Sequence, residues 1–187
     1  ASLEADINAY KSGYDQHEQQ EQAVRAQIDK QVEALRRQEE ANKKNDPSYD
    51  AGKDNGATGS MMWPCPSCHT ITSEFGWRYH PIYHTQKYHS GVDIGASYGA
   101  TIVAADGGTV ITAGAVSGYG NCVVINHGNG ITTLYGHMSS IAVSSGQKVS
   151  KGQTIGYVGS TGNSTGPHLH WEVTVNGVRQ NPLNYAR

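Results

Sequence analysis

The sequence predicts a mainly β fold, an antiparallel domain of the sandwich or open-barrel kind, preceded by an α-helical coiled-coil segment. Three observations predict it: a heptad spacing of apolar residues within 1–41, a polar stretch over 42–60, and short apolar runs between glycines over 61–187. Glycine marks the division, with four in residues 1–60 and nineteen in residues 61–187. The 187 residues suffice for one ordinary domain and an appendage.

Residues 1–41 are predicted to form a helical stalk with a coiled-coil seam. Steps of four and three residues select ten positions, seven of them apolar: Leu3, Ile7, Tyr10, Tyr14, His17, Glu21, Val24, Ile28, Gln31 and Leu35. The three polar members weaken the middle of the seam, and a solvated single helix is the alternative, because an isolated helix is marginal without a partner. We expect a coiled-coil partner or self-association through residues 3–35.

Residues 42–60 are predicted to be a flexible linker, because the stretch is polar and contains Pro47 and three glycines. The β-rich domain then covers residues 61–187. Asn129-Gly130 is a strong signal for a hairpin turn between two strands, and no helical period of useful length follows residue 60. The predicted strands are Thr101–Ala105, Gly108–Ala113, Cys122–Asn126, Ile131–Tyr135, Thr154–Val158 and His168–Val175.

Composition excludes several functions. Residues 1–60 carry eight Lys or Arg against twelve Asp or Glu, a net of −4, and residues 61–187 carry six against four, a net of +2. Neither part has the dense basic patch of a nucleic-acid-binding protein. No stretch approaches the roughly 20 apolar residues of a transmembrane helix. The first residues lead directly into charged sequence without a signal-peptide pattern, so they say little about localisation.

Two pairs of residues predict a metal site. His168 and His170 lie two residues apart at the start of a predicted strand, so both imidazoles should project from the same face. His89 and Asp93 are four residues apart, which also returns a side chain to one face of an extended segment. Two neutral imidazoles and one carboxylate, with a coordination position left for water, are typical of catalytic zinc.

The proton chemistry is predicted to fall to histidine. No H-E-x-x-H motif is present, so the glutamate base of that class of zinc protease is missing. His137 lies just past a predicted strand and is the best candidate to act beside the metal.

Three motifs follow one another along a single glycine-rich β domain: His89-x-x-x-Asp93, Tyr135-Gly136-His137 and His168-Leu169-His170. In this order they resemble the motifs of the lysostaphin-type (LytM-like) zinc metallopeptidases. The likeness runs from about Trp63 to Tyr185. These are secreted or envelope-associated endopeptidases that cut peptide bonds in bacterial peptidoglycan.

The resemblance implies one zinc ion held by His89, Asp93 and His170, with His137 and His168 beside the attacking water. It also implies an extracellular or cell-wall location and a peptidoglycan peptide as substrate. Relatives cut glycine–glycine bridges or crosslinks with D-amino acids and diaminopimelate, and the sequence does not choose between these bonds. Loops around the site are expected to bind the substrate, with His80, Tyr88, Tyr119 and Asn121 as the candidate contacts.

The cysteines and the remaining histidines allow other interpretations. Cys65 and Cys68 form a C-x-x-C-H sequence, which also occurs in c-type haem attachment and in half zinc sites, but an extracellular setting favours a disulfide between them. Cys122 is predicted to be a buried free thiol. His69, His84 and His127 are expected to be ordinary hydrogen-bonded residues.

The main alternative function is an envelope binding or regulatory module that docks on peptidoglycan or on a partner hydrolase. The complete set of five residues argues against it, and the helical segment argues partly for it. Residues 149–159 also resemble biotinyl/lipoyl carrier domains, but no lysine occupies residues 160–166, where the carrier lysine would stand.

Overall fold

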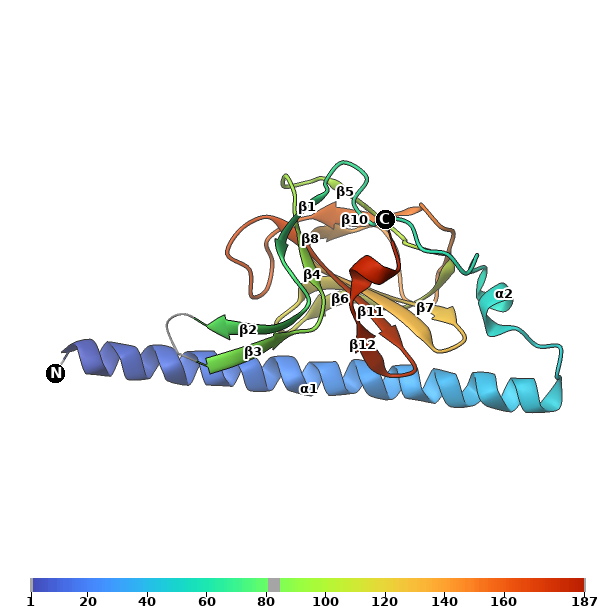
Figure 1. Cartoon of the computed structure of the whole chain (residues 1–187), viewed down its shortest axis with the longest axis horizontal. Helices are drawn as coiled ribbons and strands as arrows, with labels where there is room; N and C mark the ends of the chain where they lie inside the picture. The colour runs from blue at the N-terminus through green and yellow to red at the C-terminus, as the bar shows by residue number, and fades with distance from the viewer. Residues whose placement is uncertain (1, 81–84, 187) are drawn as a thin grey trace.

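The computed structural model describes residues 2–80 and 85–186. One long helix lies along a side of a β-rich body, and the short second helix lies near its C-terminal end (Figure 1). The elements are α1 (Ser2–Asn45), α2 (Ala51–Asn55), β1 (Thr70–Ser73), β2 (Gly76–His80), β3 (Thr85–His89), β4 (Val92–Gly95), β5 (Thr101–Val103), β6 (Gly108–Val116), β7 (Gly120–Gly128), β8 (Ile131–Ile141), β9 (Lys148–Val149), β10 (Thr154–Val158), β11 (His168–Val175), β12 (Val178–Gln180) and the 3-10 helix η1 (Pro182–Asn184).

The strands form an open antiparallel sheet, which confirms that the domain is mainly β and antiparallel. Ten strands pair along the path β1-β4-β11-β8-β7-β6-β9, with β12 added beside β11 and β10 joining β5 to β8. β2 and β3 form a separate two-stranded sheet. The core of the sheet includes the fully buried side chains of Tyr135, Ile155 and Trp171.

The predicted strands correspond to β5, β6, β7, β8, β10 and β11, and the last two have the predicted bounds. The Asn129-Gly130 turn joins β7 to β8, with φ values of 54° and 75°. Two successive positive φ values are what a two-residue hairpin turn requires. β1 to β4, β9 and β12 were not predicted, because each is only two to five residues long.

The predicted coiled coil is not confirmed, because the partner of α1 is the β domain. Ile28 and Val32 are each 7% exposed and belong to one apolar cluster with Cys122, Val124 and Leu134 of the sheet. An apolar helical face gains the same burial from a sheet as from another helix, so the heptad spacing did not identify what covers it. A coiled-coil partner or self-association through residues 3–35 stays a prediction.

Residues 42–60 differ from the predicted flexible linker. α1 continues to Asn45, and the Asp50 side chain caps α2 by accepting from the backbone N–H groups of Gly52 and Lys53. Farther on, the carboxylate of Asp106 accepts hydrogen bonds from the backbone of Thr58. Short polar segments can be fixed by such bonds, which composition does not reveal. The division into stalk, linker and catalytic domain remains a prediction.

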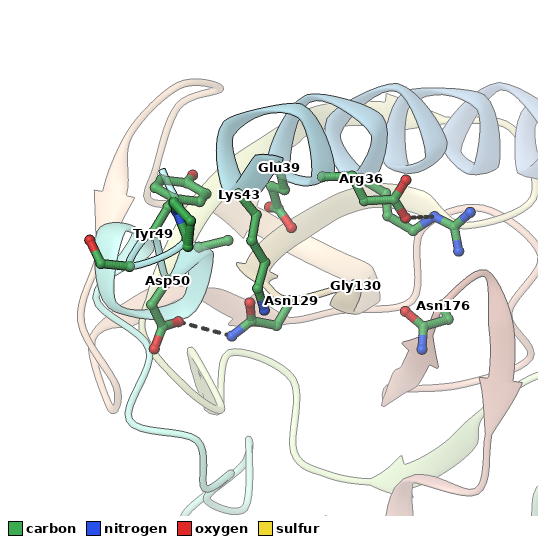
Figure 2. Close-up of a pocket in the computed structure, with 12 residues that line it drawn as sticks. Arg36, Glu39, Lys43, Tyr49, Asp50, Asn129, Gly130 and Asn176 are labelled. Carbon is green, nitrogen blue, oxygen red and sulfur yellow. Dashed lines mark hydrogen bonds and ion pairs between the residues drawn. The ribbon is translucent and has the colours of Figure 1, made fainter. Parts of the chain in front are cut away.

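A polar groove lies where α1, α2 and the β7–β8 turn meet. Figure 2 shows Lys43 of α1 facing Asn129, whose Nδ2 donates to Asp50 Oδ1 at 3.0 Å. The residues that line the groove also include Arg36, Glu39 and Tyr49. Asn126 Nδ2 also donates to Glu39 Oε1 at 3.0 Å, and this bond joins the C-terminal part of α1 to β7.

The expected disulfide is not formed, since all three cysteines are free thiols. Burial, together with a hydrogen bond to Cys68, raises the pKa of the Cys65 thiol to about 12, so Cys65 is protonated at neutral pH. Cys122 is a buried free thiol as predicted. Among the residues that the structure describes, no helix is long and apolar enough to cross a membrane.

Candidate metal centre

The register of β4 against β11 brings two of the predicted metal ligands together. The two strands are antiparallel, and His170 lies directly opposite Asp93. Because side chains alternate along a strand, His168 and His170 project from the same face of β11, while Leu169 and Trp171 enter the core from the other. One alternation along β11 thus separates the face that carries the two histidines from the face that packs in the core.

His89 reaches the same point from the end of a different strand. It is the last residue of β3, and the chain turns at Ser90-Gly91 before β4 begins. The extended segment that was expected to carry both His89 and Asp93 is therefore interrupted by a corner. Gly91 makes the corner feasible, because a Cβ at this position would collide with the backbone carbonyl of Trp171.

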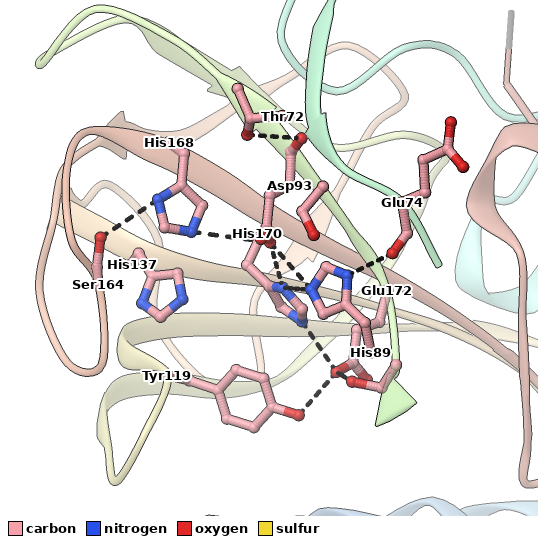
Figure 3. A network of polar contacts seen from close by, with 12 residues as sticks. Thr72, Glu74, His89, Asp93, Tyr119, His137, Ser164, His168, His170 and Glu172 are labelled. Carbon is pink, nitrogen blue, oxygen red and sulfur yellow. Dashed lines mark hydrogen bonds and ion pairs between the residues drawn. The ribbon is translucent and has the colours of Figure 1, made fainter. Parts of the chain in front are cut away.

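The three predicted ligands form a compact cluster (Figure 3). One ligand atom from each of His89, Asp93 and His170 lies within 4.8 Å of the other two. Asp93 Oδ1 is 2.8 Å from His170 Nδ1 and 3.2 Å from His89 Nε2. Both histidines are buried and the carboxylate is half-buried, so the cluster is enclosed.

Hydrogen bonds on the outer side of the rings select the nitrogens that face the cluster. His89 Nδ1–H donates to the carbonyl of Glu74 at 2.8 Å, which leaves Nε2 for a metal. His170 Nε2–H donates to Glu172 Oε1 at 3.1 Å, which leaves Nδ1. An acceptor-only oxygen behind each imidazole is the usual way in which proteins orient a histidine ligand.

His137 and His168 lie together beside the cluster. Their ring centroids are 4.6 Å apart, and His168 Nε2 is 3.7 Å from Asp93 Oδ1. Nδ1–H of His137 donates to the Thr161 carbonyl, and Nδ1–H of His168 donates to the Gly166 carbonyl, each at 2.8 Å. Both rings therefore have an Nε2 lone pair available for a proton when neutral.

The backbone at His137 is held in an uncommon conformation. Its φ is 60°, the left-handed region that non-glycine residues seldom adopt. The register between β7 and β8 is irregular next to this point, and the His137 N–H donates to the Tyr119 carbonyl at 2.7 Å. Bulges often re-aim a side chain next to an active site, and this one directs His137 away from the regular pleat.

The charges in the cluster are strongly coupled. Burial opposes ionisation of Asp93, but hydrogen bonds with His170 and His89 hold its pKa well below the usual range. Burial also opposes a charge on His170, yet hydrogen bonds with Asp93 and Glu172 raise its pKa to about 9. Burial and the neighbouring His170 charge lower the pKa of His137 to about 4, so His137 is neutral at pH 7.

The donor set fits zinc. Two imidazole nitrogens and one carboxylate oxygen converge, each imidazole has its other nitrogen fixed by an oxygen, and no cysteine is near enough to join them. Three protein ligands leave a position for water or substrate, as in catalytic zinc sites, whereas structural sites use four.

Glu172 contacts the candidate site but was not assigned to it from the sequence. It is 2% exposed, and its Oε1 also accepts from Tyr119 Oη at 2.7 Å and from Ser90 Oγ. Burial opposes its charge, but His170 and the arginines Arg25 and Arg179 hold its pKa well below the usual range. A signal was present, since Glu172 follows His170 by two residues and shares its strand face.

The predicted substrate contacts have different positions. Tyr119 is 2% exposed and bonds to Glu172, so it supports the site from behind and does not line a cleft, contrary to the prediction. Asn121 is held by Nδ2–H donation to the Met138 carbonyl at 3.1 Å. Tyr88 is 37% exposed and contacts Trp77 edge-on. The side chain of His80 lies outside the described residues, as does all of His84.

Of the histidines expected to have ordinary roles, His127 is buried. Its Nδ1–H donates to the Gly107 carbonyl at 2.7 Å, and its Nε2 is 2.8 Å from Thr133 Oγ1. It therefore behaves as the satisfied core histidine that was predicted.

Comparison with known proteins gives consistent matches. A family model described as Peptidase family M23 matches residues 87–182. The chain is 47% identical over 116 residues to the DD-carboxypeptidase/endopeptidase Mpg of Neisseria gonorrhoeae, covering 62% of this chain and 27% of Mpg. It is 40% identical over 136 residues to the peptidoglycan DD-endopeptidase ShyA of Vibrio cholerae, covering 72% of this chain and 32% of ShyA. The chain thus spans about a quarter to a third of the length of these relatives.

Another relative is named as an activator. The murein hydrolase activator NlpD of Salmonella dublin is 36% identical over 124 residues, covering 66% of this chain and 31% of NlpD. Among solved structures, a zinc containing peptidase from Vibrio cholerae matches with a TM-score of 0.62 and 35% identity, over 65% of this chain and 38% of that one. The catalytic domain of lysostaphin from Staphylococcus simulans matches with a TM-score of 0.57 and 32% identity, over 63% and 91%.

Proposed function

Because the chain belongs to peptidase family M23, we propose that it is a zinc-dependent endopeptidase that hydrolyses peptide crosslinks or stem peptides of bacterial peptidoglycan. The observation that carries the proposal is the convergence of His89 Nε2, Asp93 Oδ1 and His170 Nδ1, with the His137–His168 pair beside them. The relatives Mpg and ShyA, both named as endopeptidases, support the reaction class.

His89, Asp93 and His170 would hold the zinc ion, and the residues around them are suited to that task. A bound zinc ion lowers the pKa of a water molecule toward neutrality and polarises the carbonyl of the peptide bond. The hydrogen bonds from His89 to Glu74 and from His170 to Glu172 hold the ligand rings in orientation. Such preorganisation avoids reorientation of the ligands during the reaction.

His137 and His168 would handle the proton. His137 is neutral at pH 7, and its Nδ1–H is engaged by Thr161, so Nε2 can accept a proton from the attacking water. His168 has the same arrangement, with Nδ1–H engaged by Gly166. Once Nε2 of either ring carries a proton, that ring can donate to the developing oxyanion or to the leaving amine.

The substrate would approach over the two-stranded β2–β3 sheet, whose last residue is His89. The exposed aromatic side chains of Trp77 and Tyr79 lie on β2, at 70% and 60% exposure, and Tyr88 precedes the ligand on β3. Aromatic faces of this kind can stack along a peptide chain. We propose Tyr88 as a substrate contact.

The test combines zinc content with wall hydrolysis. We expect the full chain to contain about one zinc ion per molecule and to release peptides from purified peptidoglycan of at least one wall type. His170→Ala should lose both properties together, because it removes one of three ligands. A wild-type chain that binds no metal would refute the mechanism, and the identity of the released ends would define the bond cleaved.

A regulatory role in the cell envelope is the second candidate. It is favoured by the likeness to the activator NlpD and by a long helix outside the family match. It predicts zinc binding without hydrolysis of any wall type and stimulation of a separate hydrolase. The complete set of ligands and flanking histidines supports the enzymatic proposal over this one.

A further inference from the structure

Glu172 is where the metal site meets the N-terminal helix. Its Oε1 accepts from His170 on one side, and Arg25 of α1 approaches the same oxygen to 3.5 Å from the other. The Arg25 guanidinium also donates to Ser90 Oγ at 2.7 Å and lies 5.5 Å from the ring centroid of Tyr119. Both of those residues donate to Glu172, so Arg25 touches three parts of one network.

A second contact connects α1 with the other oxygen of Glu172. Arg179 of β12 donates through Nε to Glu172 Oε2 at 3.1 Å and through a terminal nitrogen to Asp29 Oδ1 at 2.8 Å. Asp29 is one helical turn after Arg25. Both oxygens of the buried carboxylate are thus fixed by groups that α1 supplies or orients.

Hydrophobic packing holds α1 in this position. Ile28 and Val32 lie three and seven residues after Arg25, which places all three on one side of the helix. Both apolar side chains are 7% exposed and pack on Cys122 and Val124 of β7. Figure 1 shows α1 running beside the sheet. The burial of Ile28 and Val32 against the sheet therefore helps to place Arg25, in addition to the charge of Arg25 itself.

We propose that α1 is a positioning element of the metal site, in which Arg25 and the Asp29–Arg179 pair hold Glu172 so that Glu172 fixes the His170 ring for zinc. The inference rests on the proposed zinc site and adds to it. The family match begins at residue 87, so this support comes from a part of the chain outside the family domain. Release of α1 from the sheet would then weaken metal binding.

The physical reason lies in the histidine. His170 can present Nδ1 to a metal while Nε2–H has an oriented acceptor, and a buried carboxylate without its cationic neighbours is costly to keep charged and in place. Loss of a group that directly contacts a metal-binding histidine commonly weakens metal affinity by about 10- to 100-fold. Arg25 acts one contact farther away, so we expect an effect of about tenfold.

The experiment measures zinc affinity in the full chain by competition with a chelator, together with the absorption spectrum of the cobalt-substituted protein. Arg25→Met keeps the apolar stem and removes the guanidinium, and Arg25→Lys restores the charge without the forked donors. The control is Arg37→Met, which removes the same charge from an exposed position on α1 whose contact is Glu33. We expect about tenfold weaker binding and an altered cobalt spectrum in Arg25→Met, partial recovery in Arg25→Lys, and no change in Arg37→Met.

The outcomes separate the two proposals. A wild type that binds zinc, with equal affinity and an equal cobalt spectrum in Arg25→Met, would overturn this inference and leave the zinc site standing. A wild type that binds no zinc would overturn both. If Arg25→Met does not fold, Asp29→Asn provides the same test through Arg179, with a weaker but measurable loss of affinity expected; unchanged affinity there would overturn the inference. If the role of Arg25 were purely structural, Arg25→Met would melt at a lower temperature in the presence of a chelator, but the zinc affinity of the folded protein would be unchanged.

Discussion

Glu172→Gln is the substitution that probes the most densely bonded side chain of the site. Glutamine keeps the size and one acceptor oxygen of Glu172, but it removes the negative charge that faces His170, Arg25 and Arg179. The carboxylate is 2% exposed, while the side chains of Arg25 and Arg179 are 24% and 13% exposed. The substitution therefore removes the negative charge that Arg25 and Arg179 share, while Arg179 keeps its ion pair with Asp29.

The magnitude follows from that burial. Removing one partner of a fully buried ion pair costs about 3–5 kcal/mol. Because both arginines retain some contact with water, we expect about 2–3 kcal/mol here. For a chain of this size each kcal/mol lowers the melting temperature by about 2–4 °C, so the fall should be about 4–12 °C. The zinc affinity should also fall by about 10- to 100-fold, because His170 loses its charged acceptor.

The assay is thermal unfolding in chelator and with zinc, joined to a zinc competition titration. Glu74→Gln is the matched control, because the side chain of Glu74 is exposed and its backbone carbonyl, which bonds to His89, is unchanged. If Glu172→Gln melted at the wild-type temperature and bound zinc as tightly, the argument that this carboxylate organises the site would be refuted.

Three further predictions concern pH, the helix and the corner before β4. Because its pKa is raised to about 9, protonated His170 stabilises the metal-free fold below about pH 6.5, and this contribution is lost as pH rises through 9. Protons compete with zinc for His170, so zinc affinity should fall about tenfold per pH unit below 9, and a zinc affinity that does not vary with pH would contradict this. Ile28→Ala should destabilise the docking of α1 by about 2 kcal/mol and hasten tryptic cleavage within the helix, whereas the exposed Gln27→Ala should not, and equal cleavage rates would count against the packing described. Gly91→Ala should displace β4 from β11 and abolish zinc binding, and a Gly91→Ala protein that still binds zinc would show that the corner tolerates a side chain. The control Gly114→Ala should bind zinc normally, because a Cβ at Gly114 meets nothing within 4 Å.

Much of the metal centre could be predicted from sequence because short-range geometry determines it. The alternation of β11 places His168 and His170 on one face whatever surrounds the strand. Asp93 and His89 were predicted through the motif pattern, although the stated reason, one extended segment, was wrong because the chain turns at Gly91. The three residues thus lie together as predicted, although by a different path of the chain.

The predictions for Tyr119 and for the Cys65–Cys68 pair were wrong, because they depended on tertiary contacts that the sequence does not reveal. Tyr119 was expected at the substrate and lies buried behind His170, because a tyrosine in a glycine-rich loop carries no sign of the direction it takes. The C-x-x-C spacing of Cys65 and Cys68 permits a disulfide, but both are free thiols. The linker over residues 42–60 stays a prediction, although Asp50 and Asp106 fix parts of that stretch through hydrogen bonds.

The sequence by itself predicted which residues could hold a metal, and it determined the β class of the domain and the amphipathic character of the first helix, because each depends on residue type and a period of two or about 3.5. Only the tertiary structure decided that the helix packs on the sheet and brings Arg25 and Asp29 to the network around Glu172. Periodicity shows that a helix has an apolar face, but it does not identify the surface that covers this face. Arg25 and Glu172 are 147 residues apart, and they come into contact only because α1 packs on the sheet.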